Sequence, residues 1–184
     1  VVLHKLGDLV PEPATLLAIR GELEKWGGRL IDEVARVSFL NDRRRICELL
    51  EWFTQQHWEF GLCLPPTSEC TRTPPIAFPL IRKPLVACGV KDSHHMCIYY
   101  TSDLLTPSPD FILQQFIPHY SVLYKVYIVG GEVRIQLRPS VDIETEDQRP
   151  RPFNSQALKH HDTIPPGSER QTEALRRLEP HRLS

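Results

Sequence analysis

The sequence predicts an α+β fold, with α/β character at its start, in which antiparallel strands carry flanking helices. A two-strand pattern around a Gly-Gly pair at 130–131 predicts antiparallel structure. Two earlier stretches place apolar residues at helical spacing, and the first of them is framed by short β-branched runs. This order predicts a β-α-β unit followed by a mostly antiparallel region.

Residues 123–129 and 132–138 read as the two strands of a hairpin, because glycines at 130 and 131 can take the positive φ values of a type I′ turn. The turn pairs Val129 with Glu132 and therefore Lys125 with Gln136. One face is apolar or aromatic and is expected to be core, with Tyr124, Val126, Ile128, Val133, Ile135 and Leu137. The opposite face is cationic, with Lys125, Tyr127, Arg134, Gln136 and Arg138.

The cationic face of the hairpin carries three cations and one carboxylate, Glu132. Such a face suits an anion, because Arg binds phosphate as a fork and Lys binds it as a point charge. A solvated sheet face is the plain alternative, and the hairpin alone does not decide between the two.

The first 31 residues predict the β-α-β unit. Residues 1–6 are predicted to form a short strand, and Leu16, Ile19, Leu23 and Trp26 then follow at helical spacing. Glycines at 27 and 28 end that helix, and residues 30–31 form the second strand.

A second helix is expected after Asn41 or Asp42, either of which can cap it. Its apolar positions are Ile46, Leu49, Leu50 and Phe53. Three arginines at 43–45 occupy its first turn, where the helix dipole disfavours cations. A bound anion would remove this conflict. Solvent-facing arginines with partners such as Glu48 are the alternative.

The middle of the chain predicts three strands, at 78–83, 96–100 and 111–116, after a proline-bearing loop or linker at 65–75. The loop at 87–95 holds one glycine, so by itself it is a weak phosphate signal, and most loops of this kind are plain hairpin connections. His94 and His95 lie in it and either titrate near neutral pH or are simply exposed. Further on, residues 153–155 are predicted to form a short strand, and residues 169–179 show a weak helical pattern. The His-His-Asp group at 160–162 could bind a metal ion but is more often simply surface-exposed.

Composition excludes several classes of function. Lys plus Arg number 22 against 23 Asp plus Glu, which argues against a nucleic-acid partner and requires any anion site to be local. The five cysteines form no CxxC pair, which favours reduced thiols in a cytoplasmic protein over disulfides or zinc. No apolar run is long enough for a membrane span.

Several segments together resemble one family. They are FPLIRKPLVACGVKDSHHM at 78–96, QQFIPHYSVLYKVYIVGG at 114–131, LRPS at 137–140, FNS at 153–155, VLHKLGD at 2–8 and NDRRRICELL at 41–50. In this order they are similar to the inositol-tetrakisphosphate 1-kinase (inositol 1,3,4-trisphosphate 5/6-kinase) family. The resemblance implies an ATP-grasp fold and transfer of the ATP γ-phosphate to a hydroxyl of an inositol tris- or tetrakisphosphate, with Mg²⁺.

The resemblance also implies roles for individual residues. Those that would bind ATP are Arg43, Lys83, Gln114, Gln115, Phe116, Ile117, Lys125, Ser140 and Ser155. Those that would bind the inositol phosphate are Lys5, His94, Lys125 and Arg138. Lys125 and His94 would act in catalysis, residues 114–117 would form the hinge against adenine, and 87–95 would be the flexible loop over the nucleotide.

The resemblance divides the chain into the end of an N-terminal α/β domain at 1–40, a central ATP-grasp subdomain at 41–119 and an incomplete C-terminal subdomain at 120–184. The family's Mg²⁺ ligands, two Asp and an Asn, are expected beyond Ser184, and the chain looks truncated at both ends. We expect a monomer. A truncated, non-catalytic module that binds nucleotide or inositol phosphate is the main alternative, and an ATP-grasp carboxylate-amine ligase is another.

Overall fold

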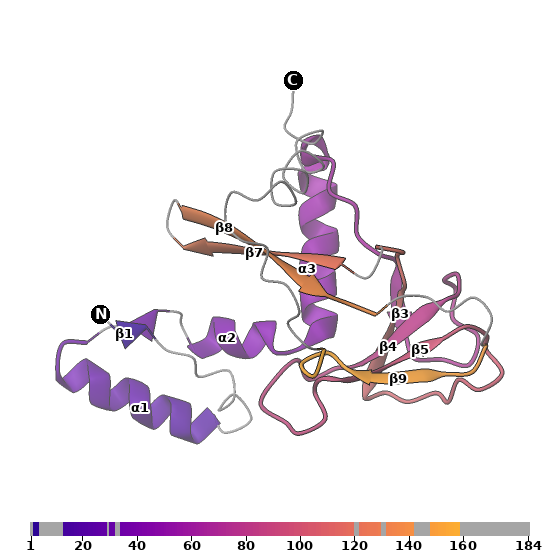
Figure 1. The fold of residues 1–184 in the computed structure, drawn as a ribbon. Coiled ribbons are helices and arrows are strands. Elements are labelled where there is room, and N and C mark those ends of the chain that lie inside the picture. Colours follow the sequence, from indigo (N-terminus) through magenta and orange to yellow (C-terminus); the bar gives the residue numbers. More distant parts are fainter. Residues whose placement is uncertain are drawn as a thin grey trace.

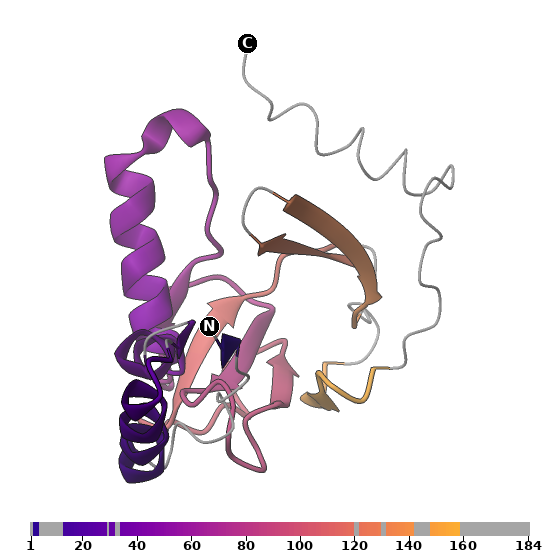
Figure 2. The ribbon, with the colours of Figure 1, turned by 90° about the vertical axis from the view of Figure 1, so that its left-hand side faces the viewer.

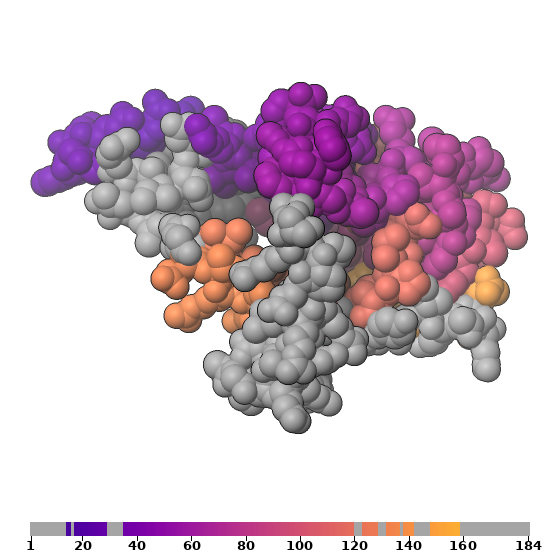
Figure 3. Space-filling view, turned by 90° about the horizontal axis from the view of Figure 1, so that it is seen from above, coloured from indigo at the N-terminus to yellow at the C-terminus, as the bar shows by residue number. Residues whose placement is uncertain are grey.

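The computed structural model describes residues 2–3, 13–28, 30–31, 34–119, 122–129, 132–141 and 148–158. Viewed from above, α3 (Arg43–Gln56) lies between α1 (Pro13–Lys25) and the strands of a five-stranded sheet (Figures 1 and 3). Lys5, the His-Asp group at 160–162 and the predicted helix at 169–179 lie outside the described residues.

The N-terminal unit is the predicted β-α-β arrangement. Strand β1 (Val2–Leu3) pairs in parallel with β2 (Leu30–Ile31), and α1 connects them. The helix ends where Gly27 takes a φ of 64°, and the Gly28 N–H bonds the Leu23 carbonyl at 2.8 Å. Trp26 was expected on the apolar helix face, but it lies just beyond the helix with 86% of its surface exposed.

Two helices lead into the sheet. The first, α2 (Val34–Leu40), was not predicted. The second, α3, confirms the predicted helix and its cap, because the Asp42 carboxylate accepts hydrogen bonds from the backbone N–H groups of Arg44 and Arg45 at 2.8 and 3.4 Å. No side chain of α3 is buried, so its apolar positions form a half-exposed face. A one-turn helix, η2 (Trp58–Phe60), follows.

The central sheet is antiparallel throughout, with strand order β3-β6-β4-β5-β9. Its strands are β3 (Thr67–Glu69), β4 (Leu80–Pro84), β5 (His95–Tyr99), β6 (Phe111–Gln115) and β9 (Arg151–Asn154). The strands expected near 78–83, 96–100, 111–116 and 153–155 are therefore confirmed. Strand β3 lies within the stretch that was expected to be loop, since three polar residues give no strand signal.

The sheet packs a hydrophobic cluster on each face. Register and alternation place Leu80, Leu113 and Tyr99 on one face, where they pack with Cys70 and Leu105. Ile81 and Ile98 point to the other face, whose cluster includes Phe116 and Val141. Lys83 follows Ile81 by two positions and so shares this second face.

The hairpin is β7 (Val122–Val129) with β8 (Glu132–Pro139), and its observed register is the predicted one, from Val129 opposite Glu132 to Leu123 opposite Arg138. In Figure 2 the hairpin lies to the right of α3. The expectation that its apolar face is core is wrong for the described residues, because Ile128 is 70% and Val133 57% exposed. Alternation identifies a face but not what packs on it.

Candidate functional site

A chain of polar side chains crosses three neighbouring strands of the sheet. The Lys83 ammonium on β4 donates to the Gln114 side-chain oxygen on β6. The Gln114 amide in turn donates to the Thr67 hydroxyl on β3 at 3.1 Å, and that hydroxyl donates to the Pro65 carbonyl at 3.1 Å. Because each group is satisfied by the next, the position of the Lys83 ammonium is set by the strand register.

The electrostatics of Lys83 are unusual. Burial, and then the positive charge of Arg43, lower the pKa of Lys83 from 10.5 to about 8, against a small opposing effect of Cys47. Burial also lowers the pKa of Arg43. Among the described residues no carboxylate forms an ion pair with either cation. Two partly buried cations without a counter-charge form a place where an anion is favoured.

Arg43 begins α3, and its guanidinium reaches across to the segment that follows β4. One terminal nitrogen donates to the carbonyls of Pro84 and Val86 at 2.5 and 2.9 Å. The other donates to the carbonyls of Ala87 and Ser93 at 3.4 and 3.0 Å. Four of the five guanidinium N–H groups are thus used within the protein.

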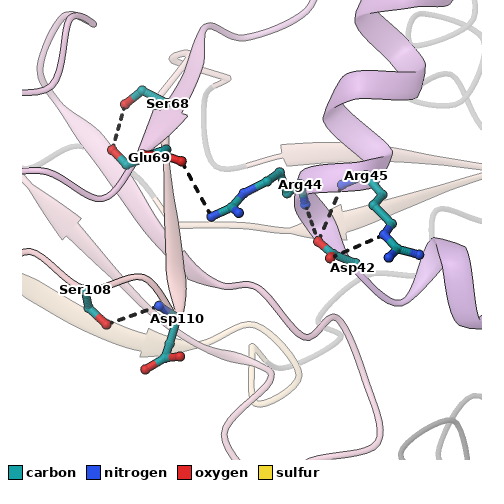
Figure 4. Close-up of polar contacts among 7 residues, drawn as sticks. All are labelled: Asp42, Arg44, Arg45, Ser68, Glu69, Ser108 and Asp110. Atoms are coloured by element: carbon teal, nitrogen blue, oxygen red, sulfur yellow. Dashed lines mark hydrogen bonds and ion pairs between the residues drawn. The ribbon is translucent and has the colours of Figure 1, made fainter.

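The other two arginines of the cluster have acidic neighbours (Figure 4). Arg44 lies 4.0 Å from the Glu69 carboxylate on β3, instead of the expected Glu48, and Arg45 lies 3.8 Å from Asp42. Both contacts are exposed and therefore weak. Figure 4 also shows the Ser108 hydroxyl accepting from the Asp110 N–H at 3.3 Å, away from these arginines. The cluster predicted at 43–45 therefore divides, and only Arg43 contributes to the uncompensated charge.

The end of the loop at 87–95 meets strand β9, and this brings two predicted site residues together. The Ser155 N–H donates to the His94 carbonyl at 3.0 Å, and the Ser155 hydroxyl lies 3.4 Å from His94 Nδ1. Next to them, His95 bonds Asp92 at 2.9 Å and Asn154 at 3.1 Å. His94 and Ser155 are 61 residues apart in the chain, so this junction follows only from the pairing of β5 with β9.

The predicted hinge residues 114–117 continue β6 into the next segment. The N–H groups of Gln115 and Phe116 bond the Pro66 and Pro79 carbonyls, each at 2.8 Å, and Phe116 is buried. These N–H groups are therefore used inside the protein. The Ile117 side chain is 48% exposed.

His119 is a candidate that the sequence analysis did not single out. One ring nitrogen, Nδ1, donates to the Ile117 carbonyl at 2.7 Å, and Nε2 lies 2.7 Å from the Ser140 hydroxyl. The ring also packs on Phe116, with centroids 5.1 Å apart. Since a carbonyl only accepts, Nδ1 carries a proton, and Nε2 shares a hydrogen bond with the Ser140 hydroxyl. His119 therefore joins the hinge to Ser140, a predicted ATP residue.

Lys125 and Arg138, on the cationic hairpin face, were also predicted to belong to the site. Lys125 is exposed, and its ammonium lies 5.1 Å from the centre of the Tyr127 ring. Arg138 is partly buried, and its Nε has no hydrogen-bond partner among the described residues. Among the described residues, no hydrogen bond or ion pair joins the Lys125 side chain to the groups that contact Lys83, His94 or Ser140.

Within the described ranges, no group of three or more His, Cys, Asp or Glu side chains is arranged to hold a metal ion. The side chains around Lys83 are the Arg43 guanidinium, the Gln114 amide and the Thr67 hydroxyl, which suit the phosphates of a nucleotide better than a divalent cation. Over the same ranges, every helix is too short or too polar to span a bilayer.

Comparison with known proteins identifies the family. Residues 65–179, which include every strand of the sheet and the hairpin, match the sequence model of the inositol 1,3,4-trisphosphate 5/6-kinase ATP-grasp domain. Inositol-tetrakisphosphate 1-kinase of Danio rerio is 30% identical over 192 residues, which cover 91% of this chain and 47% of the relative.

Two further relatives agree. The enzyme of the same name from Xenopus laevis is 30% identical over 203 residues, covering 97% of this chain and 50% of the relative. Inositol-tetrakisphosphate 1-kinase 1 of Zea mays is 45% identical over 74 residues, 39% of this chain and 22% of the relative. This chain spans about half the length of the two animal relatives. The chain belongs to the inositol 1,3,4-trisphosphate 5/6-kinase family, and its fold is ATP-grasp.

Proposed function

We propose that this chain forms the nucleotide-binding part of an inositol polyphosphate kinase that transfers the γ-phosphate of ATP to a hydroxyl of an inositol tris- or tetrakisphosphate. The observation that carries the proposal is the pair of partly buried cations, Lys83 and Arg43, beside the loop at 87–95. Such a pair is costly without an anion and suits the polyphosphate of a nucleotide. The names of the relatives support this assignment.

Phosphoryl transfer needs in-line positioning and neutralisation of charge on the transferred group, without a covalent nucleophile. Lys83 would neutralise phosphate oxygens directly, and Arg43 would add charge next to it. Mg²⁺, when bound, would neutralise the β- and γ-phosphates further. The described residues hold no cluster that fits it, so we assign its ligands to none of them.

The nucleotide base would lie against the hinge at 114–117, and Ser140 and Ser155 would complete the ATP site. The junction of His94 with Ser155 supports a common boundary between nucleotide and substrate. We assign inositol phosphate contacts to Lys5, His94, Lys125 and Arg138. Lys125 and His94 would act on the transferred group, Lys125 by its charge and His94 by its place beside Ser155.

We also propose the division into segments 1–40, 41–119 and 120–184, with the second and third enclosing the nucleotide. The protein would be a cytoplasmic monomer. None of its five cysteines forms a disulfide, which suits a reducing compartment.

The proposal is tested by calorimetric titration of the purified chain with ATP and Mg²⁺, followed by inositol 1,3,4-trisphosphate and a turnover assay on the same sample. Two results together support the site. AMP, which lacks the β- and γ-phosphates, should not bind the wild-type chain, and ATP should not bind the Lys83→Met variant. Binding without turnover identifies a binding module, the alternative function. Absence of ATP binding in the wild-type chain overturns the assignment.

A further inference from the structure

The segment 41–43 pairs with the segment 85–88 as if the two were short strands. The Arg43 N–H donates to the Leu85 carbonyl at 2.9 Å, and the Ala87 N–H donates to the Asn41 carbonyl at 2.7 Å. Asp42 and Val86 form an antiparallel bridge between them. The start of α3 is therefore joined through its backbone to the segment that leaves β4.

The Asn41 side chain extends this pairing by one residue. Its oxygen accepts from the Cys88 N–H at 2.7 Å and from the Cys88 thiol at 3.0 Å, while its amide donates to the Cys88 carbonyl at 3.2 Å. Among the described residues, the buried polar side chains are Asn41, at 8% exposed, and Ser93. A buried amide that satisfies both backbone groups of one residue fixes that residue in place.

Arg43 closes the same segment from its other end. The carbonyls that accept from its guanidinium belong to residues 84, 86, 87 and 93, so one side chain joins the beginning and the end of the loop. The last partner, Ser93, is fully buried. Val90, Lys91 and Asp92, at the tip of the loop, are exposed. The arginine therefore holds the two ends of the loop, at 84–87 and 93, and makes none of these contacts with its tip.

We propose that Asn41 and Arg43 are positioning residues. They hold residues 84–88 and 93, the two ends from which the loop at 87–95 projects, in a fixed shape next to Lys83. Arg43 then acts on the nucleotide mainly by holding this loop in place, because only its Nε N–H is left to offer a phosphate. The part of this inference that concerns the nucleotide rests on the proposed function. The part that concerns the loop is independent of it.

Arg43→Lys separates positioning from phosphate binding. Lysine keeps the positive charge, but its single ammonium cannot reach four carbonyls that a planar fork holds together. If Arg43 serves chiefly as a charged phosphate contact, Arg43→Lys retains most of the ATP affinity and leaves the loop unchanged. If it positions the loop, Arg43→Lys releases the loop although the charge is kept.

The experiment measures the alkylation rate of Cys88 by iodoacetamide in the folded chain without ATP, by peptide mass spectrometry. Cys63, which is exposed, serves as the internal standard. We expect Arg43→Lys and Asn41→Ala each to accelerate Cys88 alkylation at least about tenfold, since each removes two or more hydrogen bonds that oppose local opening. Arg45→Lys is the matched control, because Arg45 lies in the same helical turn but bonds no loop carbonyl, and its rate should equal the wild-type rate.

Hydrogen exchange of the wild-type chain gives a second readout that needs no variant to fold. The Ala87 and Cys88 amides, which donate to Asn41, should exchange at least about tenfold more slowly than the amides of 90–92. Equal exchange of the two sets, or Cys88 alkylation unchanged in both variants, overturns the proposal. Wild-type ATP affinity in Arg43→Lys overturns its nucleotide part. Loop release in a chain that never binds ATP would leave the positioning role standing and refute the proposed function instead.

Discussion

Replacing Lys83 with methionine should stabilise the ligand-free protein while abolishing its ATP binding. Methionine has a similar length and flexibility, so it fills the space of the lysine stem without a charge. A pKa lowered from 10.5 to about 8 corresponds to about 3 kcal/mol of unfavourable free energy for the charged form in the folded state. This value is an upper bound on what the substitution recovers.

Two losses offset that gain. The hydrogen bond from Lys83 to Gln114 disappears, which costs about 1 kcal/mol, and the Gln114 oxygen is left without this donor. The net stabilisation is roughly 1 to 2 kcal/mol, which corresponds to a rise in Tm of roughly 2 to 8 °C for a domain of this size. Lys25→Met, in an exposed helix position, should change the free energy of unfolding by less than about 0.5 kcal/mol.

The pH dependence distinguishes this cause from better packing. Below pH 8 Lys83 is charged in both states, so the full cost is present and the methionine advantage is largest. Between pH 8 and 10.5 the folded state has lost the proton while the unfolded state still binds it, so wild-type stability rises with pH and the advantage shrinks. Thermal unfolding at pH 7 and pH 10 measures both arms. A lower Tm for Lys83→Met at pH 7 together with retained ATP binding would refute the reasoning, and so would an advantage that is equal at both pH values.

Three further outcomes are expected. ATP binding near pH 8 should be accompanied by uptake of a proton, because the phosphate raises the pKa of Lys83. The calorimetric binding enthalpy should therefore vary with the ionisation enthalpy of the buffer, and ATP affinity should fall above pH 8. A binding enthalpy that is the same in all buffers would contradict this prediction. His119→Ala removes the contacts to Ile117 and Ser140 and should weaken ATP binding roughly 5- to 30-fold in titration, whereas His119→Asn should recover part of the loss; equal affinities exclude the role. Lys125→Ala should weaken ATP and inositol phosphate binding together with a Tm within about 2 °C of wild type, and unchanged binding of both ligands removes the hairpin from the site.

Local patterns predicted the parts of this fold that local chemistry decides. The Gly-Gly pair at 130–131 predicted a two-residue turn, and the strands on either side have the register that such a turn implies. The sequence offered Asn41 or Asp42 as the helix cap, and the structure uses Asp42. The exposed apolar face of the same hairpin was mistaken for core, since period two says which residues share a face and nothing about the neighbouring element.

The site was only partly predictable, because its contacts join residues that are distant in the chain. The excess of arginine at the start of α3 was a real signal of conflict with the helix dipole. For Arg43 the structure answers this conflict with hydrogen bonds to carbonyls that lie 41 to 50 residues further along the chain, and no local pattern indicates them. Likewise, the Lys83 to Gln114 contact requires the pairing of β4 with β6, and His119 becomes notable only once Ser140 lies 2.7 Å from its ring.

The two roles that we propose for Arg43 would explain why the cost at Lys83 persists. The hydrogen bonds that hold the loop fix the arginine charge near Lys83, so the lysine cannot be relieved by movement of the guanidinium without releasing the loop. The strand register fixes the lysine equally. In the proposed function, a polyphosphate would relieve both charges at once, and the free energy cost of the two cations in the free protein would be recovered when it binds. Lys83→Met and Arg43→Lys should therefore act in opposite directions on the stability of the free chain, the first raising it and the second lowering it, although both weaken ATP binding.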